Sequence, residues 1–353
     1  MAGQYSVEGY VFDLDTFLPQ RIFDRITDIR VYSPDVIERQ AKARKRRPRI
    51  TTDGTLTILA ADHPGRGVTQ LGDDPFKMGD RREYLGRILR VLMATDFDGF
   101  MSTPDMIEDL LIVDYLVQTG GGASFLDGKV LVGCMQRGGV AGFAGELDDR
   151  FGSYTAESIH RFNLDGGKMM VRFVRDDERT LLQVDYCSKA ITELNRYELT
   201  PFVEALRLDY EPGETPETGQ WIKKNTADEL LKLAGVLSAM GDSSRHTWLK
   251  LPYCEDFGKV ANATSLPILM LGGPSREDPR HTYQEFVSGM ATRANIRGAL
   301  VGRNVTFPGP EDPAAVGQAI YGIVHERASA DEAIETTMAR RDHKMNALTA
   351  YVK

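Results

Sequence analysis

The sequence has little cysteine and no long apolar run. Only Cys134, Cys187 and Cys254 occur in 353 residues, without a C-x-x-C pair, so the spacing indicates neither a disulfide framework nor a zinc knuckle. No stretch approaches the roughly 18 apolar residues of a membrane-spanning helix. The acidic start MAGQYSVEGYVFDLD also lacks the order of a signal peptide, which is basic and then apolar. We therefore expect a soluble protein of the reducing cytoplasm.

Positive charge is also in deficit. Lysine and arginine contribute 43 residues against 51 aspartates and glutamates, which gives a formal net charge of −8. An acidic chain has no general electrostatic attraction to nucleic acids or to anionic membranes. The composition therefore favours a small-molecule ligand, with no nucleic-acid and no membrane partner.

From about residue 56, short β-branched runs alternate with longer stretches of helical period. This alternation is typical of repeated βα units around a parallel sheet. The eight expected strands are residues 56–61, 99–102, 130–135, 168–174, 202–207, 247–251, 267–271 and 299–302. The expected helices between and after them are residues 80–94, 104–117, 177–197, 226–240, 255–263, 283–292 and 313–326.

Eight such units without a break in composition predict a single (β/α)8 TIM barrel of the α/β class, with an N-terminal helical extension. An open doubly wound sheet is the alternative, but the glycine-rich strand ends lack a dinucleotide-binding fingerprint. We expect the extension over residues 1–50, the barrel over residues 51–330 and a C-terminal helical tail over residues 331–353.

The N-terminal extension carries a strongly basic run. Its two expected helices cover residues 19–29 and 34–46, and the second overlaps the run at residues 42–49. The run fits a nucleic-acid arm, or a solvated helix face that caps the bottom of the barrel or meets another subunit. The acidic charge of the whole chain favours the second interpretation.

Lys250 is the main catalytic candidate. Barrel enzymes carry their catalytic groups at the carboxyl ends of the strands. Lys250 lies among apolar neighbours near such an end, on the same side of its strand as Trp248 and facing the expected interior. An apolar interior near other cations lowers the pKa of a lysine from about 10.4, which favours the neutral amine that attacks a ketone. The alternative is a lysine that extends to solvent or pairs with Glu255 or Asp256.

Other charged residues lie on neighbouring strands. Lys168 and Arg172 are four residues apart and share one face of their strand, where either is suited to depress the pKa of Lys250 or to hold an anionic substrate group. Glu204 interrupts an apolar run, so this carboxylate needs a buried partner. Asp62 follows the first strand, where it directs protons and orients the lysine or else forms an Asx turn or a helix cap.

Glycine turns follow the last two expected strands. Gly272 and Gly273 end one strand and Gly302 ends the other. Backbone N–H groups in such turns bind oxyanions, and the loops after the seventh and eighth strands are the usual phosphate site of these barrels. Arg303 adds a side chain suited to bidentate phosphate binding, and His63, at the end of the first strand, is a further candidate for substrate binding.

Three motifs together resemble the class I, Schiff-base aldolases, the group of the fructose-bisphosphate, tagatose-bisphosphate and deoxyribose-phosphate enzymes. They are Ala61-Asp62-His63, Trp248-Leu-Lys-Leu-Pro-Tyr253, and Gly272-Gly273 together with Gly302-Arg303-Asn304. The resemblance spans about residues 56–326. It implies an acid motif on the first strand, a Schiff base on the lysine of the second motif and a phosphate site at the glycine turns.

Two further residues and two departures refine this resemblance. Lys168 and Glu204 are more similar to the tagatose-bisphosphate branch, in which the corresponding lysine and glutamate lie in the active site. The first motif continues as His-Pro-Gly-Arg instead of His-Gly, and Phe202 and Glu204 replace aromatic acid–base residues of archaeal members. These departures leave the identity of the substrate open.

The chain is most similar to actinobacterial aldolase-like barrel proteins that are linked to inositol catabolism. This resemblance implies cleavage of 2-deoxy-5-keto-gluconate 6-phosphate to dihydroxyacetone phosphate and malonate semialdehyde. It also implies a homo-oligomer, because the relatives assemble into rings or larger oligomers.

The expected reaction is retro-aldol cleavage of a ketose through a lysine Schiff base, without a metal or another cofactor. Three other hypotheses are open: another Schiff-base lyase or transaldolase, a metal-dependent class II aldolase, and a non-catalytic barrel that binds a sugar phosphate. A class II enzyme needs about three clustered protein ligands, whereas of six histidines only His63 clearly ends a strand.

Overall fold

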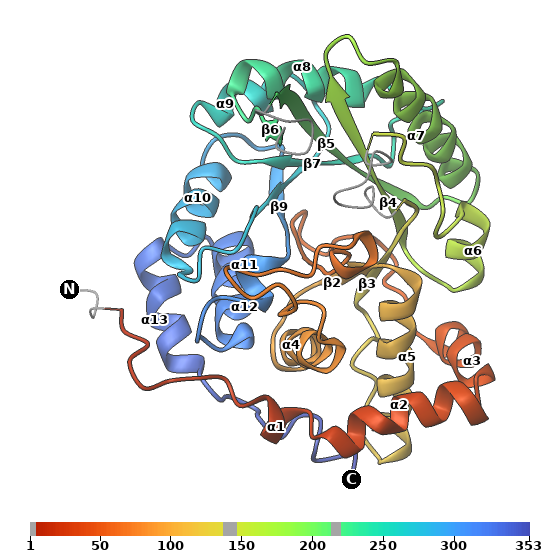
Figure 1. Cartoon of the computed structure of the whole chain (residues 1–353), viewed down its shortest axis with the longest axis vertical. Coiled ribbons are helices and arrows are strands. Elements are labelled where there is room, and N and C mark those ends of the chain that lie inside the picture. Colours follow the sequence, from red (N-terminus) through yellow and green to blue (C-terminus); the bar gives the residue numbers. More distant parts are fainter. Residues whose placement is uncertain (1–4, 137–146, 213–219) are drawn as a thin grey trace.

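Eight parallel strands close into a barrel in the computed structural model, which describes residues 5–136, 147–212 and 220–353 (Figure 1). The barrel strands are β1 (Leu56–Ala60), β2 (Gly99–Ser102), β3 (Val130–Cys134), β4 (Gly166–Val174), β5 (Thr200–Glu211), β7 (Trp248–Pro252), β8 (Ile268–Leu271) and β9 (Ile296–Val301). They neighbour one another in chain order, and the parallel pairing of β9 with β1 closes the ring. The predicted (β/α)8 TIM barrel is confirmed.

The two faces of each barrel strand belong to different parts of the core. Alternate side chains such as Ile58, Phe202 and Trp248 fill the inside of the barrel, where they form one apolar cluster. The intervening side chains, such as Leu59 and Leu249, pack outward against the helices. Strands buried on both faces need apolar residues at nearly every position, which explains the continuous apolar runs in the sequence.

Helices surround the barrel (Figure 1). They are α4 (Arg81–Ala94), α5 (Pro104–Thr119), α6 (Ala156–Arg161), α7 (Glu178–Arg196), α8 (Ala227–Ser238), α9 (Phe257–Ala261), α10 (Arg280–Met290), α11 (Arg303–Thr306), α12 (Pro313–Tyr321) and α13 (Ala330–Arg340). Asp80, Thr226 and Asp312 cap α4, α8 and α12 by accepting hydrogen bonds from backbone N–H groups of the first turn. In the described part of the chain, no helix combines the length and the apolar character needed to cross a membrane.

One strand was not predicted. β5 continues beyond the barrel, and β6 (Gln220–Lys223) pairs with this extension in the antiparallel direction. The fifth strand was expected to end at residue 207, because a parallel βα unit does not include a returning strand. Figure 1 shows β5 and β6 labelled close together near α8.

The N-terminal helices pack on one side of the barrel. They are α1 (Leu14–Phe17), α2 (Gln20–Tyr32) and α3 (Asp35–Ala43), and α2 and α3 contact α5. The C-terminus lies beside them in Figure 1, where Arg25 donates a hydrogen bond to the carbonyl oxygen of Lys353. The N-terminal segment and the end of the chain thus meet on the same side.

The basic run after α3 lies at the amino-terminal end of the barrel. Arg44 forms an ion pair of 2.9 Å with Asp165, and Arg47 forms one of 2.7 Å with Asp98. These two aspartates immediately precede β4 and β2. The run therefore caps the bottom of the barrel, as the favoured interpretation predicted, but its description as solvated was wrong for Arg44, whose side chain is only 1% exposed.

Candidate active site

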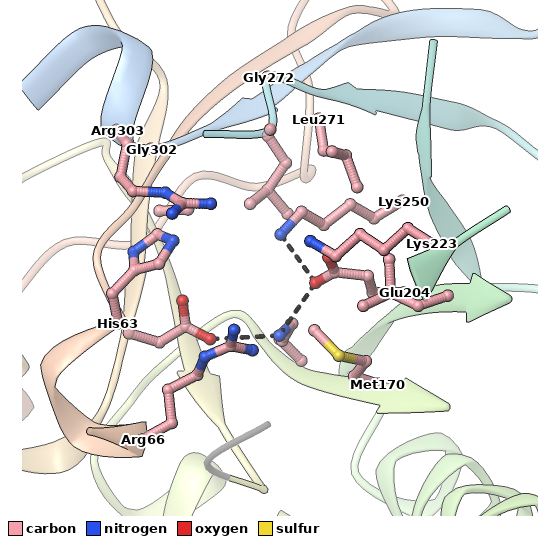
Figure 2. A pocket seen from close by; sticks show the side chains of 16 residues that line it. His63, Arg66, Met170, Glu204, Lys223, Lys250, Leu271, Gly272, Gly302 and Arg303 are labelled. Atoms are coloured by element: carbon pink, nitrogen blue, oxygen red, sulfur yellow. Dashed lines mark hydrogen bonds and ion pairs between the residues drawn. The ribbon is translucent and has the colours of Figure 1, made fainter. Parts of the chain in front are cut away.

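A cavity opens at the carboxyl ends of the barrel strands (Figure 2). Its described lining is rich in charge, and it consists of Ala60, Asp62, His63, Arg66, Lys168, Met170, Glu204, Leu206, Lys223, Lys250, Leu271, Gly272, Gly273, Leu300, Gly302 and Arg303. Five of these side chains are cations and two are carboxylates. The resulting excess of positive charge suits an anionic ligand.

A chain of ion pairs crosses the floor of this cavity. The Lys250 Nζ atom lies 2.8 Å from Oε2 of Glu204, and the Lys168 Nζ atom lies 3.0 Å from the same oxygen. Lys168 also contacts Oδ2 of Asp62 at 3.2 Å. Dashed lines in Figure 2 follow this chain. All four side chains are at most 8% exposed, so their charges interact with little screening by water.

The strand register brings these residues together. Glu204 of β5 is the register partner of Lys250 on β7, so the two side chains leave neighbouring strands at the same height. Lys168 of β4 lies one layer lower, level with Phe202. Beneath Glu204 and Lys250, two residues earlier on each strand, Phe202 and Trp248 form an apolar floor.

The side chains of these ion pairs stabilise one another in their charged forms. Burial by itself would raise the pKa of Glu204, but Lys168 and Lys250 lower it to about 2. Burial likewise acts against the ionised form of Asp62, yet Lys168 holds the pKa of this carboxyl well below its usual range. The two carboxylates outweigh the effect of burial on Lys168 and raise the pKa of its ammonium. At neutral pH, Lys168 is therefore a cation held between two anions.

The imidazole of His63, which lies beside these ion pairs, is neutral. Burial, together with the positive charge of Arg303, lowers the pKa of the imidazole to about 3, although Asp62 acts in the opposite direction. The hydroxyl oxygen of Tyr84 on α4 lies 3.5 Å from Nδ1 of His63. A neutral imidazole is able to donate one hydrogen bond and accept another, so His63 is suited to contact substrate hydroxyl groups.

The two glycine turns lie side by side. The side-chain amide of Asn304, which follows the β9 turn, donates a hydrogen bond to the carbonyl oxygen of Gly272, which follows β8. A Cβ atom on Gly302 would lie 2.6 Å from the carbonyl oxygen of Ala60, so this close approach requires glycine. Backbone groups of both turns are thereby exposed to the cavity.

Arg303 extends the positive wall at these turns. Its Nε atom is buried and has no hydrogen-bond partner among the residues that the structure describes. Burial, together with the charge of Arg66, lowers the pKa of this guanidinium. An incoming phosphate would supply the missing acceptor.

Nine of the ten predicted site residues line the same cavity. The exception is Arg172, which points to the same side of β4 as Lys168 and Met170 but is buried farther along the strand, 3.4 Å from Asp149. The described lining of the cavity does not include Arg172, so the role expected for this residue stays a prediction. Met170, which lies between Lys168 and Arg172 in the sequence of β4, lines the cavity.

Two cations of the site, Arg66 and Lys223, were not predicted from the sequence. Arg66 belongs to the short helix η1 (Pro64–Arg66), directly after the recognised Asp62 and His63, so its place in the same turn was the available signal. Lys223 reaches the cavity from β6. Partial burial and the charge of Arg303 lower the pKa of Lys223. Within the described ranges, no group of three or more His, Cys, Asp or Glu side chains is arranged to hold a metal ion.

Comparison with known proteins gives relatives at moderate and at low sequence identity. Cgl0159 from Corynebacterium glutamicum is 29% identical, with a TM-score of 0.78 over 87% of this chain and 97% of that chain. An archaeal fructose-1,6-bisphosphate aldolase, solved with its catalytic lysine bound to a carbinolamine intermediate, is 17% identical, with a TM-score of 0.55 over 82% and 99%. A fructose-bisphosphate aldolase from Slackia heliotrinireducens is 13% identical, with a TM-score of 0.56 over 96% and 99%.

The chain shares its barrel fold with these aldolases. No curated protein matches the sequence. The family model described as Cgl0159-like matches residues 54–320, which is most of the chain. The protein therefore belongs to the Cgl0159-like family.

Proposed function

We propose that the protein is a class I aldolase in which Lys250 forms a Schiff base with a phosphorylated ketose. The observation that carries this proposal is the contact of 2.8 Å between the Lys250 amine and Glu204, inside a cavity that has an excess of cations. A buried amine beside a carboxylate has both the nucleophile and the proton acceptor that imine formation requires.

The reaction begins when Glu204 accepts a proton from Lys250 and the free amine attacks the substrate carbonyl carbon. The carbinolamine nitrogen is neutral, so Glu204 loses one of the two cations that lower its pKa and becomes a stronger base. Glu204 returns its proton to the carbinolamine hydroxyl group, which leaves as water, so that the protonated imine and the Glu204 carboxylate remain. Glu204 then removes a hydroxyl proton while the C–C bond breaks, and its electrons pass into the imine. An aldehyde leaves, and protonation and hydrolysis of the enamine release the second product.

The remaining residues hold the substrate and the charges in place. Lys168 stays protonated and positions the carboxylates of Glu204 and Asp62, to which it is bonded. The glycine turns and Arg303 bind the phosphate group of the substrate. His63 contacts its hydroxyl groups. Arg172 takes no part in this proposal, because it lies outside the cavity lining.

The substrate that the resemblance suggests is 2-deoxy-5-keto-gluconate 6-phosphate. Its cleavage would give dihydroxyacetone phosphate and malonate semialdehyde. We further propose a cytoplasmic homo-oligomer organised as an N-terminal extension (residues 1–50), a barrel (51–330) and a C-terminal tail (331–353). The fold shared with the archaeal aldolase whose catalytic lysine binds the carbinolamine intermediate supports the reaction class.

Borohydride trapping tests the reaction. The purified protein is reduced in the presence of 2-deoxy-5-keto-gluconate 6-phosphate, fructose 1,6-bisphosphate or dihydroxyacetone phosphate, and the adduct is located by peptide mass spectrometry. We expect it on Lys250 in the wild type, no adduct in Lys250→Met, and an unchanged adduct in the matched control Lys224→Met. Failure of all three compounds to label Lys250 would overturn the proposal. Analysis of the released aldehyde then separates an aldolase from a transaldolase or another Schiff-base lyase.

A further inference from the structure

The register of the β5–β6 hairpin directs Lys223 into the cavity. Lys223 is paired with Leu208 in the antiparallel ladder, and directly opposite residues place their side chains on the same face. Side chains alternate along a strand, so Leu208 shares its face with Leu206 and Glu204. Both of these residues line the cavity. Figure 2 shows the Lys223 side chain reaching into the site on the same side as Lys250 and Glu204.

Lys223 differs from the neighbouring lysines in that it has no acidic partner among the described residues. Lys168 and Lys250 are bonded to Glu204, and Lys224, the next residue along the chain, lies 3.9 Å from Glu211. Lys223 forms no ion pair within residues 5–136, 147–212 and 220–353. A cation that faces a cavity without a counter-ion is available to a ligand.

A second cation without an ion pair stands across the cavity. Arg303 lies on the opposite wall in Figure 2, beside the glycine turns, and it forms no ion pair with any described residue. Lys250 and Glu204 lie on the side of Lys223, across the cavity from Arg303. A ligand with a phosphate at Arg303 and an uncharged far end would leave Lys223 without a counter-ion.

We propose that Lys223 is a specificity-determining residue that binds a second anionic group, a carboxylate or a phosphate, at the end of the substrate remote from Arg303. The chemical class of the substrate is then a sugar derivative that carries negative charge at both ends. This inference rests on the phosphate site of the proposed function, but it does not depend on Schiff-base formation at Lys250.

Binding of three hexose derivatives that lack a ketone tests this inference independently of the reaction. Glucitol 6-phosphate has one anionic end, 6-phosphogluconate adds a carboxylate at the other end, and glucitol 1,6-bisphosphate adds a phosphate there. Dissociation constants are measured by calorimetry for the wild type, for Lys223→Met and for the matched control Lys224→Met. The unfolding midpoint of each variant is measured to show that it is folded.

In the wild type we expect at least one of the two doubly anionic compounds to bind more tightly than glucitol 6-phosphate. Lys223→Met should weaken that binding about fivefold, the upper range for an exposed ion pair, and should leave glucitol 6-phosphate unchanged. Lys224→Met should change none of the three affinities. The compound that loses affinity identifies the second group as a carboxylate or a phosphate, and a loss by both means that Lys223 accepts either.

Three results would overturn the inference: equal binding of all three compounds to the wild type, an equal loss for all three in Lys223→Met, and no binding of any compound. The first two leave the trapping of ketoses on Lys250 unaffected. A failed trapping experiment with intact discrimination between the three compounds would instead reject the aldolase and retain the role of Lys223.

Discussion

Replacement of Glu204 by glutamine tests the ion-pair chain directly. The carboxylate lies 2.8 Å from the Lys250 amine and 3.0 Å from the Lys168 amine, and all three side chains are buried. A lowering of the pKa of Glu204 from 4.5 to about 2 corresponds to about 3 kcal/mol of stabilisation of the folded state at neutral pH. Removal of one partner from a buried ion pair costs a similar amount, about 3–5 kcal/mol. We therefore expect Glu204→Gln to lower the free energy of unfolding at pH 7 by about 3 kcal/mol.

The pH dependence of this loss follows from the sign of the shift. Because the folded state lowers the pKa of Glu204, its stabilisation is complete above about pH 4.5 and is lost as the pH falls toward 2. Urea unfolding should give a constant difference between wild type and variant from pH 6 to 8 and a smaller one at pH 4. A difference below about 1 kcal/mol at pH 7 would refute this account of the ion-pair chain.

A double variant separates the lost charge from a general disturbance of packing. Glu204→Gln leaves the Lys250 ammonium buried without a carboxylate, and the added change Lys250→Met removes that charge. We expect the double variant to be more stable than Glu204→Gln alone, since an unpaired buried cation costs more than an apolar side chain of similar size. A less stable double variant would show that the two substitutions act through packing.

Other groups give further predictions. Hydrogen bonds to Asp98 and Asp53 raise the pKa of His325 despite its burial, so this residue stabilises the fold below about pH 6.5 and loses that effect as the pH rises through its raised pKa. The loss of stability in His325→Gln, measured by urea unfolding, should therefore be larger at pH 6 than at pH 9. Arg303→Met should raise the KM for a phosphorylated substrate about tenfold or more, and an unchanged KM would exclude Arg303 from the phosphate site. Burial raises the pKa of the Cys134 thiol, so a thiol reagent at pH 8 should label it only as fast as the protein unfolds.

Much of the barrel could be predicted from the sequence because its strands are buried on both faces. Such strands need apolar runs, and the helices between them repeat their own period, so eight units are visible without any tertiary information. Lys250 and Glu204 could be singled out because each interrupts such a run. Their contact could not be predicted, because it depends on the register between β5 and β7.

The positions of Arg172 and Lys223 could not be predicted, because a local sequence pattern does not give the height of a side chain along the barrel. Arg172 shares the parity of Lys168, but each pair of residues advances the strand by about 7 Å, which takes Arg172 past the cavity to Asp149. Lys223 was missed because an antiparallel return strand has no place in a βα repeat. The two-residue alternation along a strand predicts the face on which a side chain lies. The height that the side chain reaches in the barrel depends on the length and the stagger of the strands.

The two ends of the barrel both carry cations, but they differ in whether these cations form ion pairs within the fold. At the amino-terminal end, Arg44 is bonded to Asp165, and Arg47 is bonded to Asp98, so these cations are neutralised within the fold. At the carboxyl end, Lys223 and Arg303 line the cavity without an ion pair to any described residue, although partial desolvation of such a charge costs stability. A sequence shows basic residues near strand ends in both places and cannot tell them apart. An excess of charge kept at a free-energy cost favours a ligand site over a structural role, and a ligand with anionic groups would remove that cost on binding.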